Sequence, residues 1–389
     1  MKDKRIRYGM IGGGEGSFIG AVHRKAAAMD GHLELVCGAF SSKADKSRRS
    51  GAALGLPEDR IYASYDEMMR AEAQQPTHQQ MQAVAIVTPN HVHFEPAMMA
   101  LDHGFHVIID KPITFSLAQA KKLHAKVEET GLLLALTHTY TGYPMIKEAR
   151  KRIAGGAIGR IKKIFVEYPQ GWLSTPLEQE GNKQASWRTD PEKSGAGGCI
   201  GDIGTHAANL AEYVSGARIS RLCADVNTVV EGRLLDDDAA ALLRFDNGAS
   251  GVLMATQVAA GEENNLKLRI YGTEGGFEWS HTDPNTLLYK PLDAPVQVLR
   301  AGNGYLSSAA ANNFRIPPGH PEGYLEAFAN IYVSFAKAVQ HVANGEAADT
   351  DFEDGFDFPG AADGVRGMAF VENMLCSAAT NEKWTDFEV

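Results

Sequence analysis

The stretch Ile11-Gly12-Gly13-Gly14-Glu15-Gly16-Ser17-Phe18-Ile19-Gly20 separates a short apolar strand pattern, 6–11, from a helix pattern, 20–30. Glycines allow a tight turn and a close approach of the main chain to a bound group. The first turn of the following helix presents N–H groups that have no partner inside the helix, and such a terminus favours an anion. A strand, a glycine-rich turn and a helix in this order predict an anion-binding unit in preference to a purely structural turn.

The spacing of these glycines departs from the Rossmann dinucleotide fingerprint. Gly12 and Gly14 fit its first two positions, but Ser17 occupies the third and Gly20 follows three residues later. We interpret this as a three-residue insertion in the turn, with Gly20 allowing close packing of helix against strand. The residues expected to contact a dinucleotide here are Gly12, Gly14, Gly16, Ser17, Phe18 and Ile19.

The first third of the chain alternates strand and helix patterns. Further strands are predicted at 33–40, 83–87, 106–109 and 132–137, and further helices at 43–54, 66–73, 94–103 and 121–129. Such alternation predicts parallel βαβ units, hence an α/β fold with a doubly wound parallel sheet. We expect residues 1–138 to form an NAD(P)-binding Rossmann domain.

The rhythm changes after about residue 140. An irregular insert at 170–198 and a helix at 205–214 precede long alternating strands, and Asp246-Asn247-Gly248 is a hairpin turn signal. These strands are predicted at 161–168, 221–230, 239–245, 249–255, 266–272 and 276–280, and helices at 145–154, 323–343 and 364–377. We expect 139–389 to form an α+β domain with a large, mostly antiparallel sheet, for substrate binding and oligomerisation.

Composition excludes several classes of protein. A length of 389 residues favours two domains, and a net charge of -10 without a Lys/Arg tract argues against nucleic-acid binding. No apolar run is long enough to span a bilayer, and Met1–Lys4 lead into a strand without a signal-peptide pattern. We expect a cytoplasmic protein.

Neither the cysteines nor the acidic residues suggest a metal site. The four cysteines lie far apart without metal-ligand spacing, and they are Cys37, Cys199, Cys223 and Cys376. The run Asp236-Asp237-Asp238 is interpreted as a solvated turn before a strand in preference to a metal site.

The end of the second strand normally reads the adenosine ribose. No Asp or Glu stands there to bind a 2′-hydroxyl, as an NAD enzyme usually requires. Ser41 and Ser42, with Lys43 and Arg48 nearby, are able to hold a 2′-phosphate, which leans the prediction from NAD towards NADP. The same cations equally fit the solvated face of a helix.

Two more segments follow predicted strands at the edge where α/β sheets bind ligands. Thr88-Pro89-Asn90 ends one strand, where Asn90 is a candidate for the nicotinamide ribose and His93 for the start of the next helix. Asp110-Lys111-Pro112 ends the next strand.

In Gly201-Asp202-Ile203-Gly204-Thr205-His206, a carboxylate and an imidazole stand four residues apart, so they share one helix face. Lys111, Asp202 and His206 near a dinucleotide form a proton-handling set for oxidising a hydroxyl. The alternative for His206 is a structural hydrogen bond at a helix N-terminus.

These motifs, in this order, resemble the glucose–fructose oxidoreductase, inositol dehydrogenase and rhizopine-catabolism family over essentially the whole chain. The segments that carry the resemblance are the glycine-rich turn, 88–90, 110–112, 155–159, 201–206 and 271–275. The resemblance implies that Lys111 stabilises or relays the substrate proton, that Asp202 positions a sugar, and that His206 is the general acid/base. The family motif Glu-Lys-Pro reads Asp110-Lys111-Pro112 here, with a shorter carboxylate beside the lysine.

Aromatic and basic residues are further candidates for contacts with a carbohydrate. Aromatic rings stack on the apolar faces of sugars, and an arginine offers a fork for hydroxyls or an anionic group. The candidates are Tyr140, Trp172, Trp187, Arg188, His320 and Tyr324, each of which is equally compatible with a packing role. The family often has an arginine near Tyr140, where this sequence has Thr141-Gly142, so we expect substrate recognition unlike that of the inositol enzymes.

The leading hypothesis is an NAD(P)-dependent dehydrogenase acting on a secondary hydroxyl of a sugar, polyol or glycoside. The alternative is a glycoside hydrolase similar to the family's NAD-dependent glycosidases, which oxidise C3 transiently and retain the cofactor. A non-catalytic binding protein is disfavoured by the intact Lys111, Asp202 and His206 set. An open antiparallel sheet also favours a homodimer or homotetramer.

Overall fold

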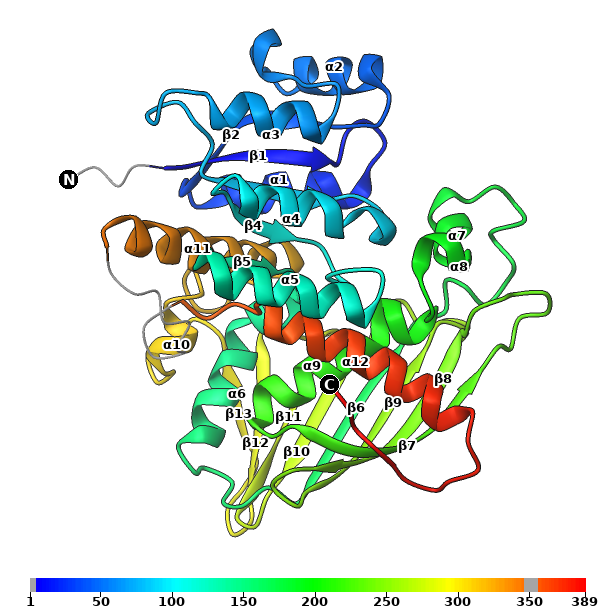
Figure 1. Cartoon of the computed structure of the whole chain (residues 1–389). Helices are drawn as coiled ribbons and strands as arrows, with labels where there is room; N and C mark the ends of the chain where they lie inside the picture. Colours follow the sequence, from blue (N-terminus) through cyan, green and yellow to red (C-terminus); the bar gives the residue numbers. More distant parts are fainter. Residues whose placement is uncertain (1–4, 346–355) are drawn as a thin grey trace. The chain divides into compact units, whose positions relative to one another are not determined.

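The computed structural model of the chain describes residues 5–345 and 356–389, which divide into two compact units (Figure 1). Unit 1 is Met1–Gly142 with Tyr324–Gly364, and unit 2 is Tyr143–Gly323 with Val365–Val389. The helix predicted near 323–343 therefore groups with the first unit, although the predicted boundary at 138/139 placed it in the second domain. Residues 1–4, on which the expectation of no signal peptide falls, lie outside the described residues.

Unit 1 is built on a parallel sheet whose strand order is β2-β1-β3-β4-β5. Its strands are β1 (Ile6–Gly12), β2 (Leu33–Ala39), β3 (Ala83–Val87), β4 (His106–Ile109) and β5 (Leu134–Leu136). The chain leaves β1 for β2 on one side and returns to β3 on the other, so the carboxyl ends of β1 and β3 form the topological switch point. The predicted doubly wound parallel sheet is confirmed.

The helices of unit 1 include one that comes from the last quarter of the chain. They are α1 (Phe18–Met29), α2 (Ala44–Ala53), α3 (Tyr65–Ala73), α4 (Phe94–Asp102), α5 (Leu117–Thr130) and α11 (Tyr324–Ala343), with short 3₁₀ turns at Glu58–Arg60, Asn90–Val92 and Thr139–Gly142.

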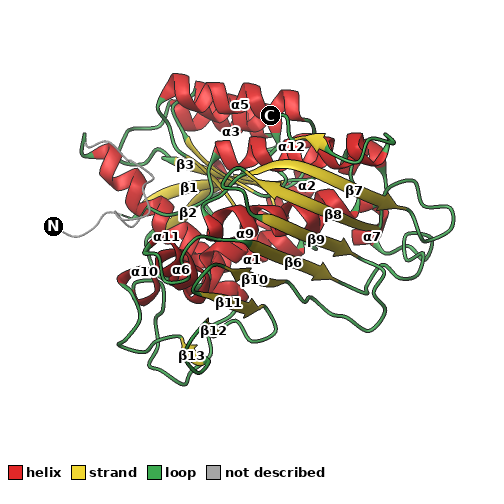
Figure 2. Cartoon of the chain, turned by 90° about the horizontal axis from the view of Figure 1, so that it is seen from below, coloured by secondary structure: helices red, strands yellow, loops and turns green. Residues whose placement is uncertain are grey.

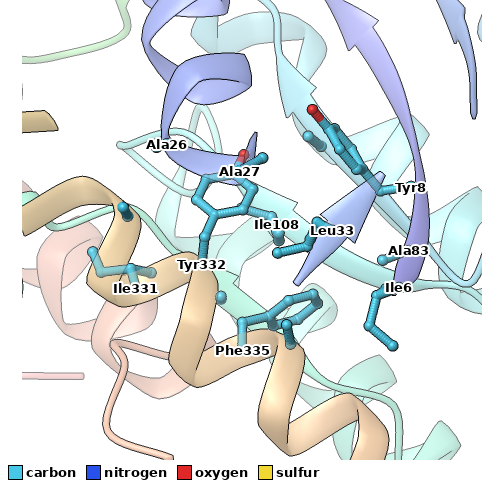
Figure 3. Packing of buried hydrophobic residues seen from close by; sticks show 14 of the residues in the cluster. Ile6, Tyr8, Ala26, Ala27, Leu33, Ala83, Ile108, Ile331, Tyr332 and Phe335 are labelled. Atoms are coloured by element: carbon cyan, nitrogen blue, oxygen red, sulfur yellow. The ribbon is translucent and has the colours of Figure 1, made fainter. Parts of the chain in front are cut away.

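Helix α11 joins the core of unit 1 through one apolar face. Phe328, Ile331, Tyr332 and Phe335 recur at the spacing of one helix face, and all four are fully buried against α1 and the sheet. Figure 3 shows Tyr332 and Phe335 directed from α11 towards Ala27, Ile108 and neighbouring strand residues. Burial of each such side chain contributes about 1.5–3 kcal/mol, which explains why a segment so distant in sequence completes this core.

The glycine-rich turn between β1 and α1 depends on a close approach of two backbones. Gly12 and Gly13 have positive φ angles of 79° and 69°, which favour glycine. A Cβ on Gly20 would lie 2.3 Å from the Cα of Gly13. The prediction that Gly20 allows close packing of the helix is therefore confirmed.

Unit 2 is dominated by a large, mostly antiparallel sheet of strand order β13-β12-β11-β10-β6-β9-β8-β7-β14, seen in Figure 2. Its strands are β6 (Lys163–Pro169), β7 (Ile219–Asn227), β8 (Asp238–Phe245), β9 (Ser250–Thr256), β10 (Lys267–Tyr271), β11 (Gly275–Ser280), β12 (Thr286–Pro291), β13 (Gln297–Arg300) and β14 (Thr385–Asp386). The pair β6–β9 is parallel and the other pairs are antiparallel. The predicted α+β architecture is confirmed.

Unit 2 also contains several helices. They are α6 (Pro144–Ala154), α7 (Lys183–Arg188), α8 (Pro191–Ser194), α9 (Thr205–Ser215), α10 (Ser308–Ala311) and α12 (Ala361–Ala378), the last belonging to unit 2 from Val365 onward. Helix α9 packs on α6 and on β6, β9 and β10. Alternate residues of β8 are buried accordingly, as Ala241 and Leu243 are, while Leu242 between them is exposed.

Some elements of unit 2 differ from the sequence prediction. The stretch 170–198 was predicted to be irregular, yet it contains the short helices α7 and α8. Asn182 caps α7 by accepting the N–H groups of Gln184 and Ala185, and Asp190 caps α8 through the N–H of Glu192. Within the described ranges, 5–345 and 356–389, no helix has the length and apolar character needed to cross a membrane.

We expect the substitution Gly20→Ala to destabilise the protein by about 1–3 kcal/mol, because the added methyl group overlaps the backbone at Gly13. Thermal unfolding followed by circular dichroism measures the effect. Gly304→Ala is the matched control, since a Cβ at Gly304 meets no atom within 4 Å. Equal unfolding midpoints for the two variants would contradict the close approach described above.

Candidate functional site

The turn at the switch point of unit 1 is held by local hydrogen bonds. Ser17 caps α1, its Oγ accepting the N–H of Gly20 at 3.2 Å, and Arg24 Nη1 donates to the Gly13 carbonyl at 2.6 Å. Phe18, the first residue of α1, is 71% exposed, whereas Ile19 packs on the core. The N-terminus of a three-turn helix thus stands directly behind a turn with little side-chain bulk, an arrangement that accommodates a phosphate group.

The candidates at the end of β2 face solvent. Ser42, Lys43 and Arg48 are exposed, and Arg48 Nη1 lies 3.9 Å from the equally exposed Asp45. Ser41 Oγ accepts the main-chain N–H of Lys43 at 3.2 Å. Of the two interpretations drawn from the sequence, the geometry of Arg48 matches the solvated helix face.

The end of β3 presents a buried hydroxyl without a partner. Thr88 Oγ1 makes no hydrogen bond within the described part of the chain, and its Cγ2 lies 3.0 Å from where a Cβ on Gly12 would stand. An unpaired buried hydroxyl costs free energy unless a bound group satisfies it. Asn90 is buried in the 3₁₀ turn that follows Pro89.

The buried His93 side chain lies between the segments that follow β3 and β4. Its Nε2 lies 2.8 Å from the Thr88 carbonyl and its Nδ1 lies 2.8 Å from the Pro112 carbonyl. Burial lowers the pKa of His93, so a neutral ring donates to one of these carbonyls. The contacts fix the segment after β3 relative to the segment after β4.

Asp110 organises the end of β4. Its Oδ1 accepts the main-chain N–H of Lys111 at 2.9 Å and the Thr137 hydroxyl at 3.0 Å, and it lies 3.9 Å from His23 Nε2. Burial alone would raise the pKa of Asp110, but the facing imidazole of His23 and the nearby Lys111 hold that pKa well below its usual range. A fixed negative charge therefore stands beside the half-buried Lys111.

The residues at this end of the unit 1 sheet fit a dinucleotide. The turn of Gly12 and Gly13 has no room for side chains, α1 offers its N-terminus, and the buried Thr88 hydroxyl needs a partner. The geometry of Arg48 shows no preformed fork for a 2′-phosphate.

In unit 2, Asp202 and His206 lie on one continuous helical segment. Asp202 is in a π-helical turn, Ile200–Gly204, that runs directly into α9, where His206 is the second residue. Such π-helical turns occur frequently at functional sites. Asp202 Oδ2 accepts hydrogen bonds from Arg188 Nε at 3.2 Å and from Gln257 Nε2 at 2.9 Å, and both Asp202 and His206 are largely buried.

A second carboxylate, that of Asp236, accepts hydrogen bonds from the main chain at the start of this helical segment. Asp236 accepts the N–H of Gly198 at 2.6 Å and that of Ile200 at 2.7 Å, while burial raises its pKa to about 6. Asp237 accepts the N–H groups of Val229 and Val230 and pairs with the buried Arg233 at 3.0 Å. The prediction of a solvated turn here was wrong, because these carboxylates replace water with main-chain donors and an arginine.

The aromatic candidates of unit 2 gather around Arg188. Its guanidinium carbon lies 4.3 Å from the ring centroid of Trp187 and 5.8 Å from that of Trp172. Its Nη1 also donates to Gln184 Oε1 at 2.6 Å. The Asp202 carboxylate is therefore bounded by an arginine that two indole rings hold in place.

A network of amide and hydroxyl groups, missed in the sequence analysis, extends from Asp202. Gln257 Nε2 also approaches Gln170 Oε1 at 3.4 Å, Gln170 Nε2 donates to Asn264 Oδ1 at 2.7 Å, and so does the Tyr168 hydroxyl at 2.7 Å. The Tyr168 ring centroid lies 6.5 Å from that of His206. The available signal was that Tyr168 and Gln257 stand at the ends of the parallel strands β6 and β9.

The remaining candidates have surroundings of their own. Tyr140 is buried in the 3₁₀ turn that ends the first segment of unit 1, and Tyr324 begins α11 with its ring 5.9 Å from that of Phe328. His320 is exposed in unit 2, where its Nδ1 approaches the Pro317 carbonyl at 3.1 Å. Among the described residues, no group of His, Cys, Asp and Glu is arranged to hold a metal ion.

Comparison with known proteins identifies the family. Residues 6–138 match the model of the oxidoreductase family with an NAD-binding Rossmann fold, and residues 146–278 match that of the GFO/IDH/MocA C-terminal domain. The chain belongs to the GFO/IDH/MocA oxidoreductase family. The resemblance drawn from the sequence motifs is thereby confirmed.

The chain is similar over most of its length to several oxidoreductases. The chain is 31% identical to an uncharacterized oxidoreductase of Bacillus subtilis (strain 168), covering 99% of this chain and 98% of the relative. It is 28% identical to levoglucosan dehydrogenase of Pseudarthrobacter phenanthrenivorans over 78% of this chain and 79% of that enzyme. A solved structure of an inositol dehydrogenase homolog from Azotobacter vinelandii, complexed with NAD+, is 35% identical, with a TM-score of 0.94 over 99% of this chain and 98% of the other.

We expect Asp236→Asn to destabilise unit 2 by about 1–3 kcal/mol, because an amide cannot accept both N–H groups that the carboxylate accepts. Urea unfolding followed by fluorescence measures the change in midpoint. Asp225→Asn on the exposed side of β7 is the control with the same chemical change. Indistinguishable midpoints for both variants would show that Asp236 does not hold the segment.

Proposed function

We propose that this oxidoreductase removes a hydride from a secondary hydroxyl-bearing carbon of a sugar or polyol. The observation that carries the proposal is the Asp202–His206 pair on one helical segment, with Asp202 oriented by Arg188 and Gln257. A carboxylate acceptor and an imidazole base next to each other are the groups that a hydroxyl requires when it loses its proton.

The proposal gives each residue a distinct role. Asp202 accepts a hydrogen bond from a substrate hydroxyl, and His206 accepts the proton of the hydroxyl that is oxidised. Lys111, beside the ionised Asp110, stabilises the developing alkoxide or passes on its proton. NAD, when bound, accepts the hydride. The residues proposed to hold NAD are those of the turn 12–20 and Thr88, whose buried hydroxyl lacks a partner among the described residues.

The substrate class is supported by the chemistry around Asp202. Gln170, Gln257 and Asn264 supply both amide donors and amide acceptors, which suit the alternating donors and acceptors of a polyol. Trp172 and Trp187 supply aromatic faces. Among the relatives, levoglucosan dehydrogenase acts on a sugar derivative, and the inositol dehydrogenase homolog has been solved with NADH and myo-inositol.

We propose NAD as the cofactor, although the sequence slightly favoured NADP. Arg48 is exposed and lies 3.9 Å from the exposed Asp45, so this arginine is not preorganised to bind a 2′-phosphate. The solved relatives contain NAD+ or NADH.

Assembly into a homodimer or homotetramer through the open face of the unit 2 sheet is part of the proposal. That face carries the exposed Leu242 and Val298 among paired charges such as Arg269 and Glu167. A mixed apolar and charged surface of this kind is typical of protein interfaces.

We expect incubation with NAD and a panel of sugars, inositols and nitrophenyl glycosides to raise the absorbance at 340 nm, with a larger kcat/KM for NAD than for NADP. A gain of one reduced cofactor per product establishes the dehydrogenase. Nitrophenol release with catalytic NAD and no gain at 340 nm would replace the proposal with the glycosidase mechanism. No reaction with any member of the panel under either cofactor would contradict both.

With the best substrate, His206→Asn and Lys111→Met should each lower kcat by about 100-fold, because loss of a positioned acid or base typically costs that much or more. The pH dependence of kcat/KM should lose a limb in His206→Asn. His78→Asn and Lys121→Met change the same residue types at exposed positions and serve as controls. A His206→Asn variant with the kcat of the controls would remove His206 from the proposed mechanism.

A further inference from the structure

A histidine and a tyrosine that no proposed role uses are buried behind Lys111. His23 lies on α1, one turn beyond the glycine-rich turn, and Tyr332 lies on α11; neither side chain is accessible to solvent. Figure 3 shows the Tyr332 ring reaching from α11 to α1 beside Ala26 and Ala27. A buried imidazole among apolar groups is costly unless both ring nitrogens are accommodated.

The contacts of His23 assign its proton. Its Nδ1 lies 2.7 Å from the Tyr332 hydroxyl. Its Nε2 makes no hydrogen bond among the described residues, and it lies 3.9 Å from Asp110 Oδ1, an ion-pair distance. Burial raises the pKa of Tyr332 well above its ordinary value, so the hydroxyl keeps its proton and donates a hydrogen bond to Nδ1. With Nδ1 accepting that hydrogen bond, the ring carries a hydrogen on Nε2, towards the carboxylate, whereas a hydrogen on Nδ1 alone would set the lone pair of Nε2 against a negative charge.

We propose that His23 is a positioning residue for Lys111: its Nε2–H, fixed by Tyr332, keeps the Asp110 carboxylate ionised and oriented, and Asp110 in turn holds the Lys111 main chain. This inference rests on the proposed function for the role of Lys111. It also gives α11, which carries Tyr332, a role in unit 1 beside the burial of its apolar face.

The other polar groups near Asp110 come from elements other than α1, so His23 is the residue of α1 that faces the carboxylate. Thr137 and the Lys111 N–H occupy the same oxygen from the β4 and β5 side. His138, after β5, has its pKa lowered to about 3 by burial and by Lys111, so it is neutral. His93 is engaged by the carbonyls of Thr88 and Pro112. Tyr8 on β1 has its pKa raised by burial and also remains neutral.

The test compares His23→Leu, His23→Gln and Tyr332→Phe in the full-length protein with its NAD-dependent activity. Leucine removes the donor, glutamine restores an N–H near the position of Nε2, and phenylalanine removes only the hydroxyl. His106→Gln is the matched control, since His106 is a buried histidine of the same unit that contacts Leu133 and Phe335.

We expect His23→Leu to lower kcat about 10-fold while KM changes less than about 2-fold, because a misplaced lysine affects the chemical step. His23→Gln should recover most of kcat, and Tyr332→Phe should fall between the two. An unchanged kcat in His23→Leu, or a His23→Gln variant as impaired as His23→Leu, would overturn the proposal.

A second readout needs no activity. If His23 and Asp110 interact, Asp110→Asn combined with His23→Leu should lower the unfolding midpoint less than the sum of the two single changes, by a few degrees. Additive shifts would overturn the contact. If the wild-type protein oxidises no substrate, the proposed function fails, whereas this cycle still decides whether His23 and Asp110 are coupled.

Discussion

The Asp110 carboxylate accepts the N–H of Lys111 and the Thr137 hydroxyl, while His23 faces it across 3.9 Å. Hydrogen bonds to a charged group contribute about 1.5–3 kcal/mol each, more than neutral ones. Through this one side chain the ends of β4 and β5, helix α1 and helix α11 become interdependent. Asp110 stays ionised although it is buried, because its partners lower its pKa. Its hydrogen bond with the N–H of Lys111 then fixes the main chain at that residue.

In unit 2 a buried carboxylate likewise accepts main-chain N–H groups, here next to the segment that carries Asp202. Asp236 accepts two main-chain N–H groups ahead of the π-helical turn, and that turn carries Asp202 and leads to His206. In both units a structural carboxylate orders the main chain, and the residue proposed for chemistry follows within six positions of the ordered peptide. Function and packing are therefore linked: each carboxylate needs main-chain donors, and each proposed functional residue needs a fixed backbone.

The sequence predicted the elements whose patterns are strong and local. Strands such as 83–87 and 106–109 were predicted with the bounds observed, because they are short, fully buried and apolar. Helix α5 begins earlier than predicted, although Ser116 and Gln119 form a cap that signals its start. Strands β12 and β13 were missed because they are half-exposed and lack a clear alternation. The place of α11, the partners of Asp110 and the amide network around Gln257 are products of tertiary contact, which no local pattern encodes.

The most direct test of this account is a crystal structure of the protein with NAD+ bound. We predict that the pyrophosphate lies over the turn of Gly12, Gly13 and Gly16, and that Thr88 Oγ1, unpartnered among the described residues, bonds to the dinucleotide. A dinucleotide bound elsewhere, or a Thr88 hydroxyl still without a partner, would contradict the assignment of the β1/β3 switch point as the cofactor site.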